Sequence, residues 1–267
     1  MNPSRLAEFL ASHILLWSIG SCLLLVLFVW LSSLVLKAFW ERHRDRMESH
    51  FNRIGYVRIY VIAGFLLSLA FAWGFGECIE MAFQKDPASS FDQLFSIALH
   101  SEANHSAVEI FGYITLLGDT LTALVLGLLM GLWLLLRKEY SLLTMWCVGL
   151  SGNTLLIKFL KSGFQRHRPV FEDPFSTEPY YSFPSGHSMT AIVLYGLLAY
   201  VAYKLVPSSV NWMTTTVLLT IGTLVGMSRL VLGVHYFSDV LGGWIVGFEW
   251  VAVCVVGTQI YLCRWPR

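Results

Sequence analysis

Long apolar runs, each about one membrane thickness in length, dominate the hydrophobic pattern of this chain. A helix needs about 20 apolar residues to cross the hydrocarbon core of a bilayer. Polar residues separate the runs in short clusters and do not alternate with apolar ones, which is typical of membrane-spanning helices. The pattern predicts an all-α, polytopic transmembrane helix bundle with seven spans. These predicted spans are 13–36, 58–76, 118–136, 141–160, 188–205, 212–231 and 241–262.

Composition supports this prediction. Hydrophobic residues make up 56% of the chain and charged residues only 13%, so no stretch is left for a separate soluble domain. The first run is too long for the core of a signal peptide and lacks a convincing cleavage site, so we interpret 13–36 as a retained span.

The distribution of Lys and Arg predicts the orientation of the bundle. Segment 37–58 holds six basic residues, and loops of this kind stay on the cytoplasmic side. Threading seven spans from there places Arg137, Lys138, Lys204 and Arg264 on the same side. The opposite connections hold mainly acidic residues, so the N-terminus is expected outside.

The long outer connection 77–117 contains one further predicted helix. Residues 91–99 have the pattern of a helix lying on the membrane interface, with Asp92 near its start. His100 and His105, with glutamates nearby, suggest either metal ligands or polar residues on a wet helix. The second interpretation is favoured, because helix positions three or four apart lie together and these two are five apart.

Three short stretches on the predicted outer side carry the candidate chemistry, at 161–169, 184–187 and 228–239. Together they supply three cations, a turn of small residues, two histidines and a carboxylate. This set of groups suits the binding of a phosphoryl group and its transfer to an imidazole.

His235 and Asp239 form the candidate nucleophilic pair. They are four residues apart, so in a helix they share one face. A carboxylate there accepts a hydrogen bond from one ring nitrogen, which fixes the tautomer and makes the other nitrogen more nucleophilic. The alternative, a capping Asp beside an unrelated histidine, becomes weak once the other two stretches are considered.

The middle stretch, Pro184-Ser185-Gly186-His187, predicts a helix start that binds phosphate. Ser185 suits the N-cap and Gly186 permits close approach of the backbone. The first amides of a helix have no internal partner and attract anions. His187 at this rim can protonate a leaving oxygen, although a helix N-terminus disfavours the imidazolium form.

Lys161, Arg168 and Arg229 supply the positive charge. The planar fork of arginine suits bidentate phosphate binding, while lysine acts as a point charge. Lys158 and Arg166 are interpreted as anchors at the membrane edge.

The three stretches resemble the signature of the type 2 phosphatidic acid phosphatase (PAP2) superfamily of lipid phosphate phosphatases. That signature has a Lys and an Arg-Pro separated by six residues, then Pro-Ser-Gly-His, then Ser-Arg, His and Asp at fixed spacing. Every position is present in this chain. The resemblance covers about 57–262, and the stretch 115–119 also looks like the family. We therefore divide the chain into 1–56, an additional span with a basic loop, and 57–267, a six-span core.

The resemblance implies a role for each site residue. His235 would be the nucleophile that forms a phosphohistidine, with Asp239 orienting it and His187 as acid and then base. The reaction would need no metal and no cofactor. The substrate would be a membrane lipid phosphate in the bilayer, and no nucleic-acid partner is expected. The residues implied to bind phosphate are Lys161, Arg168, Ser185, Gly186, Arg229 and Ser228.

The function that follows is a hydrolase of a lipid phosphomonoester or diphosphate. A phosphotransferase would use the same first half-reaction, and a phosphate-recognising transporter would leave His235 and Asp239 unexplained. Phosphatidate, phosphatidylglycerol phosphate and undecaprenyl diphosphate all fit the motifs, and the oligomeric state is left open. We expect a bacterial cytoplasmic (inner) membrane protein with its active site facing the periplasm or exterior.

Overall fold

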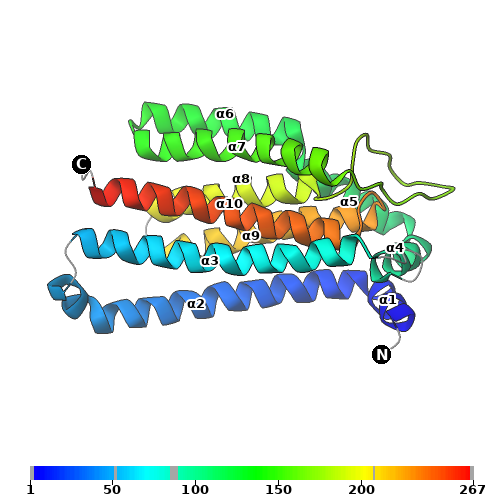
Figure 1. Cartoon of the computed structure of the whole chain (residues 1–267), viewed down its shortest axis with the longest axis horizontal. Helices are drawn as coiled ribbons and strands as arrows, with labels where there is room; N and C mark the ends of the chain where they lie inside the picture. Colours follow the sequence, from blue (N-terminus) through cyan, green and yellow to red (C-terminus); the bar gives the residue numbers. More distant parts are fainter. Residues whose placement is uncertain (1–2, 51–52, 85–89, 207, 265–267) are drawn as a thin grey trace.

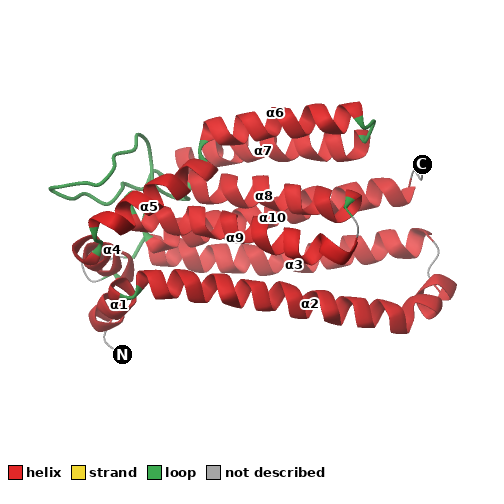
Figure 2. Ribbon diagram, turned by 180° about the vertical axis from the view of Figure 1, so that it is seen from behind, coloured by secondary structure: helices red, strands yellow, loops and turns green. Residues whose placement is uncertain are grey.

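The computed structural model describes residues 3–50, 53–84, 90–206 and 208–264, and within these ranges the regular structure is entirely helical. Helices follow one another along the chain with short connections, except for one long loop before α8 (Figures 1 and 2). Their bounds are α1 Pro3–Ser12, α2 Ile14–His50, α3 Arg53–Ala82, α4 Phe91–Glu102, α5 His105–Thr115, the 3₁₀ turn η2 Leu116–Gly118, α6 Thr120–Leu136, α7 Tyr140–Phe164, α8 Gly186–Leu205, α9 Ser208–Val231 and α10 Phe237–Arg264.

The predicted membrane bundle is confirmed. Within the described residues, five helices are long and apolar enough to cross a membrane, and the number rises to seven if each of two bent helix pairs is one span. The predicted runs lie in α2, α3 and α6 to α10, apart from residue 13 and residues 118–119, and α4 contains the helix predicted at 91–99. The division of the chain at residue 56 stays a prediction.

One span begins differently from its prediction. Helix α5 and η2 lead into α6 with a bend of 41°, so the span predicted at 118–136 is the second half of a bent pair. The bend has a local cause at Asp119, whose backbone is extended. Its carboxylate accepts a hydrogen bond from the Thr120 amide at 2.7 Å. An N-cap of this kind starts a new helix direction.

Helix α8 lies at the centre of the bundle, packed against α7, α9 and α10. Most of its residues are buried, whereas the outer helices expose large apolar side chains along their length. Small residues bring the neighbouring helices close, since a Cβ atom at Gly152 would lie 2.2 Å from the Trp250 ring. Small residues at helix contacts and apolar residues outside are typical of membrane proteins.

The predicted separation of motifs and basic loops is present. Helices α1, α4 and α5 and the long loop 165–185 gather at one end of the bundle, near the N-terminus (Figure 1). Helices α8 and α10 begin at that end and run to the opposite end, where Lys204 and Arg264 lie. The three motif stretches therefore share one end.

Candidate active site

His235 lies in the short connection between α9 and α10, with its side chain almost fully buried. Its Nδ1 is 3.2 Å from Oδ2 of Asp239, in the first turn of α10, and its Nε2 is 3.1 Å from Nη1 of Arg168. An arginine only donates, so Nε2 is the accepting nitrogen and Nδ1 carries the proton toward the carboxylate. The predicted pairing of His235 with Asp239 is present, but the expected shared helix face is wrong. His235 precedes α10, so the turn that leads into the helix brings the two side chains together.

The start of α8 lies directly beside this pair. Ser185 is the N-cap of the helix, and its hydroxyl oxygen accepts from the amide and the hydroxyl of Ser188. Its own amide donates to the backbone oxygen of Asp239 at 2.9 Å. This bond fixes the first turn of α8, which carries His187, against the first turn of α10.

Arg168 connects the loop to the candidate nucleophilic pair, His235 and Asp239. Besides His235, its guanidinium donates to the backbone oxygens of Val234 at 2.7 Å and Tyr180 at 3.0 Å. Lys161, near the end of α7, donates to the backbone oxygen of Tyr181. Both cations are therefore held by the backbone of the loop or of the connection that carries His235.

Arg229, near the end of α9, has a buried side chain whose charge is paired. Its Nη2 lies 2.5 Å from Oε1 of Glu178, and its Nη1 donates to the Thr115 hydroxyl at 2.6 Å. Burial alone would raise the pKa of Glu178, but Arg229, His187 and Arg168 outweigh it and lower that pKa. The sequence did not identify Glu178, because no local pattern marks a loop residue that meets a helix 51 positions away.

All three predicted cations act on His235, and two of them, Lys161 and Arg168, donate to the same Tyr181 backbone oxygen. Burial lowers the pKa of His235 well below 6.5, and the charges of Arg168, Arg229 and Lys161 lower it further, in that order. An imidazole surrounded by cations stays neutral, which keeps its free nitrogen nucleophilic.

The interpretation of Arg166 as a membrane-edge anchor is wrong. Its guanidinium forms ion pairs with Asp239 at 2.6 Å and with Asp92 at 2.8 Å, and only 11% of the side chain is exposed. Asp92, the second residue of α4, is fully buried. Lys158 is exposed, in keeping with an anchor.

The stretch 115–119, which resembled the family less specifically, contributes to the same site. Thr115 accepts from Arg229, and Oδ1 of Asp119 lies 3.8 Å from Nε2 of His187. A Cβ atom at Gly118 would lie 2.3 Å from the Val225 side chain, so this turn passes close against α9.

Ser228 and Gly186, both predicted to bind phosphate, differ in their surroundings. Ser228 is fully buried and its hydroxyl donates to the Val225 carbonyl at 2.6 Å, so its part in phosphate binding stays a prediction. Gly186 is the first residue of α8, where a Cβ atom would meet only side-chain atoms, none nearer than 3.5 Å. Packing within the protein therefore does not require glycine there.

Of the two histidines in the outer connection, His100 serves packing and His105 is exposed. The His100 ring stacks between Phe171 and Phe175, with ring centroids 3.9 and 4.2 Å away. Among the residues that the structure describes, no group of three His, Cys, Asp or Glu side chains could hold a metal ion.

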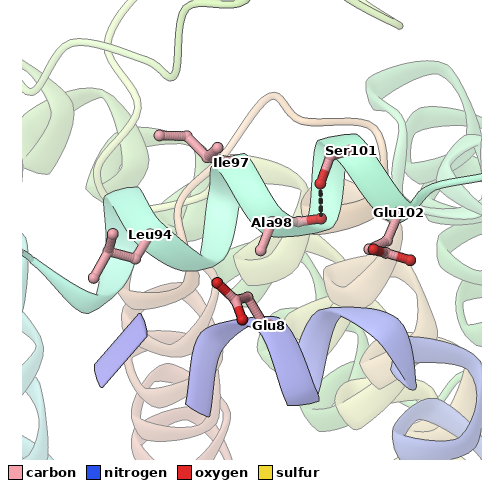
Figure 3. A pocket seen from close by; sticks show the side chains of 6 residues that line it. All are labelled: Glu8, Leu94, Ile97, Ala98, Ser101 and Glu102. Atoms are coloured by element: carbon pink, nitrogen blue, oxygen red, sulfur yellow. Dashed lines mark hydrogen bonds between the residues drawn. The ribbon is translucent and has the colours of Figure 1, made fainter. Parts of the chain in front are cut away.

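A separate pocket of about 210 Å³ lies between α1 and α4 (Figure 3). Glu8 projects toward α4 from α1, and Glu102 lies at the end of α4. No residue of the three motif stretches lines this pocket, so it is distinct from the candidate active site. Its lining residues are Glu8, Leu94, Ile97, Ala98, Ser101 and Glu102.

Comparisons with known proteins give matches to one family. The family model for the PAP2 superfamily matches residues 140–261. A curated relative, phosphatidylglycerophosphatase B of Bacillus subtilis (strain 168), is 42% identical over 113 residues, which cover 42% of this chain and 55% of that protein. The match thus spans about half the length of the relative.

A solved structure covers more of the chain. The crystal structure described as the first transmembrane PAP2 type phosphatidylglycerolphosphate phosphatase from Bacillus subtilis is 32% identical, with a TM-score of 0.63. The alignment covers 72% of this chain and 94% of that one.

Proposed function

Because this chain belongs to the PAP2 superfamily, we propose that it is a lipid phosphate phosphatase that works through a phosphohistidine on His235. The observation that carries the proposal is the fixed tautomer of His235. Nδ1 faces the Asp239 carboxylate and Nε2 faces Arg168 among three cations. A phosphate-binding protein without catalysis would have no need for a buried, oriented nucleophile.

In the first half-reaction, Nε2 of His235 attacks the phosphorus atom of the bound lipid phosphate. The new bond is N–P, and the bond from phosphorus to the lipid oxygen breaks. His187 donates its proton to that leaving oxygen, while the Nδ1–H of His235 stays bonded to Asp239. The negative charge of Asp239 stabilises the imidazole as it becomes positive.

Binding of the phosphate is assigned to Lys161, Arg168, Arg229 and the first amides of α8 from Gly186 onward. These groups are fixed before substrate arrives, so they stabilise the charge that spreads over the phosphoryl oxygens in the transition state. Ser185 supports them by capping α8. A phosphate oxygen would accept from Arg168 where Nε2 of His235 accepts from it now.

In the second half-reaction, neutral His187 removes a proton from a water molecule that attacks the phosphohistidine. The N–P bond breaks, inorganic phosphate leaves and His235 returns to its neutral state. Asp119 lies 3.8 Å from Nε2 of His187, and the dianionic phosphate of a bound substrate adds the negative charge that favours the imidazolium against its unfavourable position at a helix N-terminus.

We infer that the substrate is a lipid phosphate at the outer surface of a bacterial inner membrane, and phosphatidylglycerol phosphate is the first candidate. Both relatives are described as phosphatases of this lipid. The basic helix ends lie opposite the motifs, which supports an outward-facing site by the positive-inside rule.

Phosphate release from a panel of lipid phosphates tests this function. Purified wild type and His235→Ala are compared on phosphatidylglycerol phosphate, phosphatidate and undecaprenyl diphosphate, with a metal chelator present. The proposal expects chelator-resistant release by wild type and none by the variant. No release from any lipid by folded wild type would refute hydrolysis, and phosphate transfer seen only with an added acceptor lipid would identify a phosphotransferase.

A further inference from the structure

A chain of buried charges leads from the nucleophilic pair to α4. The Nη1 of Arg166 donates to Oδ1 of Asp239 at 2.6 Å, and its Nη2 donates to Oδ2 of Asp92 at 2.8 Å. Both carboxylates are at most 1% exposed in their side chains. A buried ion pair is costly to form, and removing one partner leaves an uncompensated charge.

The two oxygens of Asp239 have separate partners. Oδ2 accepts from Nδ1 of His235 at 3.2 Å and from the Tyr236 amide at 2.9 Å. Oδ1 accepts from Arg166. A carboxylate bonded on both sides cannot rotate without losing one set of bonds, so Arg166 determines the plane in which Asp239 meets His235.

Asp92 holds Arg166 in turn. Besides that arginine, it accepts from the amide of Ser238 at 3.0 Å and from the Ser238 hydroxyl. The Arg166 guanidinium also lies over the Tyr236 ring, 4.2 Å from its centroid. The position of the guanidinium is therefore fixed from α4, from α10 and from the connection before α10.

The charges balance in a way that suits the reaction. Asp92, Arg166 and Asp239 together carry one negative charge, so adding the imidazolium of His235 brings the group to neutrality. If Asp92 were absent, Arg166 would already cancel the charge of Asp239 before His235 becomes positive. The second carboxylate thus preserves the electrostatic support of Asp239 while Arg166 fixes its geometry.

Arginine is the residue that fits this task. Its fork reaches two different carboxylates at once, whereas a lysine presents a single point charge. We propose that Arg166, held by Asp92, is a positioning residue that fixes the Asp239 carboxylate as the acceptor for the Nδ1–H of His235. Its catalytic effect rests on the proposed function, but its effect on the hydrogen bond between His235 and Asp239 does not.

Kinetics of purified full-length variants give the first test. Arg166→Lys should lower kcat for phosphate release at least tenfold, because Asp239 loses its orientation. It should leave the inhibition constant of inorganic phosphate within twofold of wild type, because Arg166 does not line the phosphate site. Arg168→Lys should instead raise that constant, and Arg137→Lys, at the opposite end of the bundle, should match wild type in both.

A double-mutant comparison separates positioning from a general structural effect. In an Asp239→Asn background, Arg166→Lys should lower kcat by less than twofold more, because Arg166 acts through Asp239. A further tenfold loss in that background, or a weaker affinity for phosphate at unchanged kcat, would overturn the proposal. If Arg166→Lys does not fold, Asp92→Asn carries the same test, since it keeps Arg166 and the shape of the side chain.

Nitrogen NMR of ¹⁵N-histidine-labelled protein reads the tautomer without turnover, with the His235 signal assigned by its loss in His235→Gln. Wild type should show Nδ1 protonated and Nε2 free. Arg166→Lys or Asp92→Asn should weaken the hydrogen bond from Nδ1–H to Asp239, which moves the Nδ1–H proton signal upfield while Arg168 still bonds to Nε2. An unchanged Nδ1–H proton signal in both variants would refute the positioning role. If wild type released no phosphate from any lipid, the proposed function would fail, and this readout would still decide the role of Arg166.

Discussion

Gly186 and Gly152 are both helical glycines, but their surroundings differ. A Cβ atom at Gly152 would lie 2.2 Å from the Trp250 ring, whereas at Gly186 its nearest neighbour would be 3.5 Å away. Helix packing therefore requires glycine at position 152. At position 186 a Cβ atom would only touch Ile157 and Lys161 of α7, and we expect a phosphate oxygen to approach the amides of α8 there.

Alanine should therefore lower activity at position 186 and stability at position 152. Gly186→Ala should keep the melting temperature of wild type and lower kcat/KM about tenfold or more, a loss of ~1.4 kcal/mol in transition-state binding. Gly152→Ala should lower the melting temperature, because the Trp250 ring must move. Melting curves and initial rates of both variants check this, and an active Gly186→Ala would contradict the assigned phosphate position.

Glu178 is a carboxylate among the groups assigned to the phosphate. It pairs with Arg229 at 2.5 Å, and the charges of Arg229, His187 and Arg168 lower its pKa. Glu178 and the substrate phosphate are both anions and compete for Arg229. The wild-type protein therefore loses the Glu178–Arg229 ion pair when Arg229 binds phosphate.

Glu178→Gln should therefore strengthen phosphate binding. We expect the inhibition constant of inorganic phosphate to fall several-fold, in line with ~1 kcal/mol for a partly exposed ion pair. Glu172→Gln, on the same loop and exposed, serves as the matched control and should not change it. A weaker affinity in Glu178→Gln would mean that Glu178 helps to bind substrate.

At the scale of elements, the long loop before α8 is held by one aromatic cluster. His100, at the end of α4, stacks between Phe171 and Phe175. Stacked aromatic pairs contribute ~0.5–1.5 kcal/mol each beyond their buried area. The loop carries Arg168 and Glu178, so this cluster also holds their backbone in place.

Phe171→Ala should loosen the loop without unfolding the bundle. Amide hydrogen exchange of residues 170–181 should accelerate about two- to tenfold, which corresponds to the ~0.5–1.5 kcal/mol of a stacked pair. Tyr180→Ala, whose side chain is 85% exposed, should exchange like wild type. Unchanged exchange in Phe171→Ala would show that backbone contacts alone hold the loop.

The sequence predicted contacts that are local and missed those that are distant. The four-residue spacing predicted the pairing of His235 with Asp239, although His235 lies before α10 and not in a helix. The motif order predicted that Arg168 and Gly186 share one end. Arg166 was misinterpreted, because its partner Asp92 lies 74 residues away in a helix outside the motifs. An unpaired arginine near a span end has the same local pattern as a membrane anchor.

The whole molecule places a neutral histidine in a buried site beside three cations. Burial and the cations keep the pKa of His235 well below 6.5 in the folded protein, while in the unfolded chain it returns to ~6.5. Below that pH the unfolded chain binds more protons than the folded one. Stability from His235 is therefore complete above pH ~6.5 and is lost as the pH falls below it.

Melting temperatures between pH 7.5 and 5.5 test this linkage. Wild type should lose about 1 kcal/mol from His235 across this interval, and His235→Gln should lose correspondingly less. The comparison cancels all groups that the two proteins share. An equal loss in both proteins would show that His235 is protonated normally in the fold.

The central claim is that the phosphoryl group passes through His235, and rapid-quench trapping tests it most directly. Purified protein is mixed with phosphatidylglycerol phosphate labelled in its terminal phosphate and stopped in alkali, where a phosphohistidine survives. We predict a transient label on the peptide that contains His235, absent in His235→Gln and lost on acid treatment. Phosphate release by wild type without any protein-bound label, together with turnover by His235→Gln, would contradict the account.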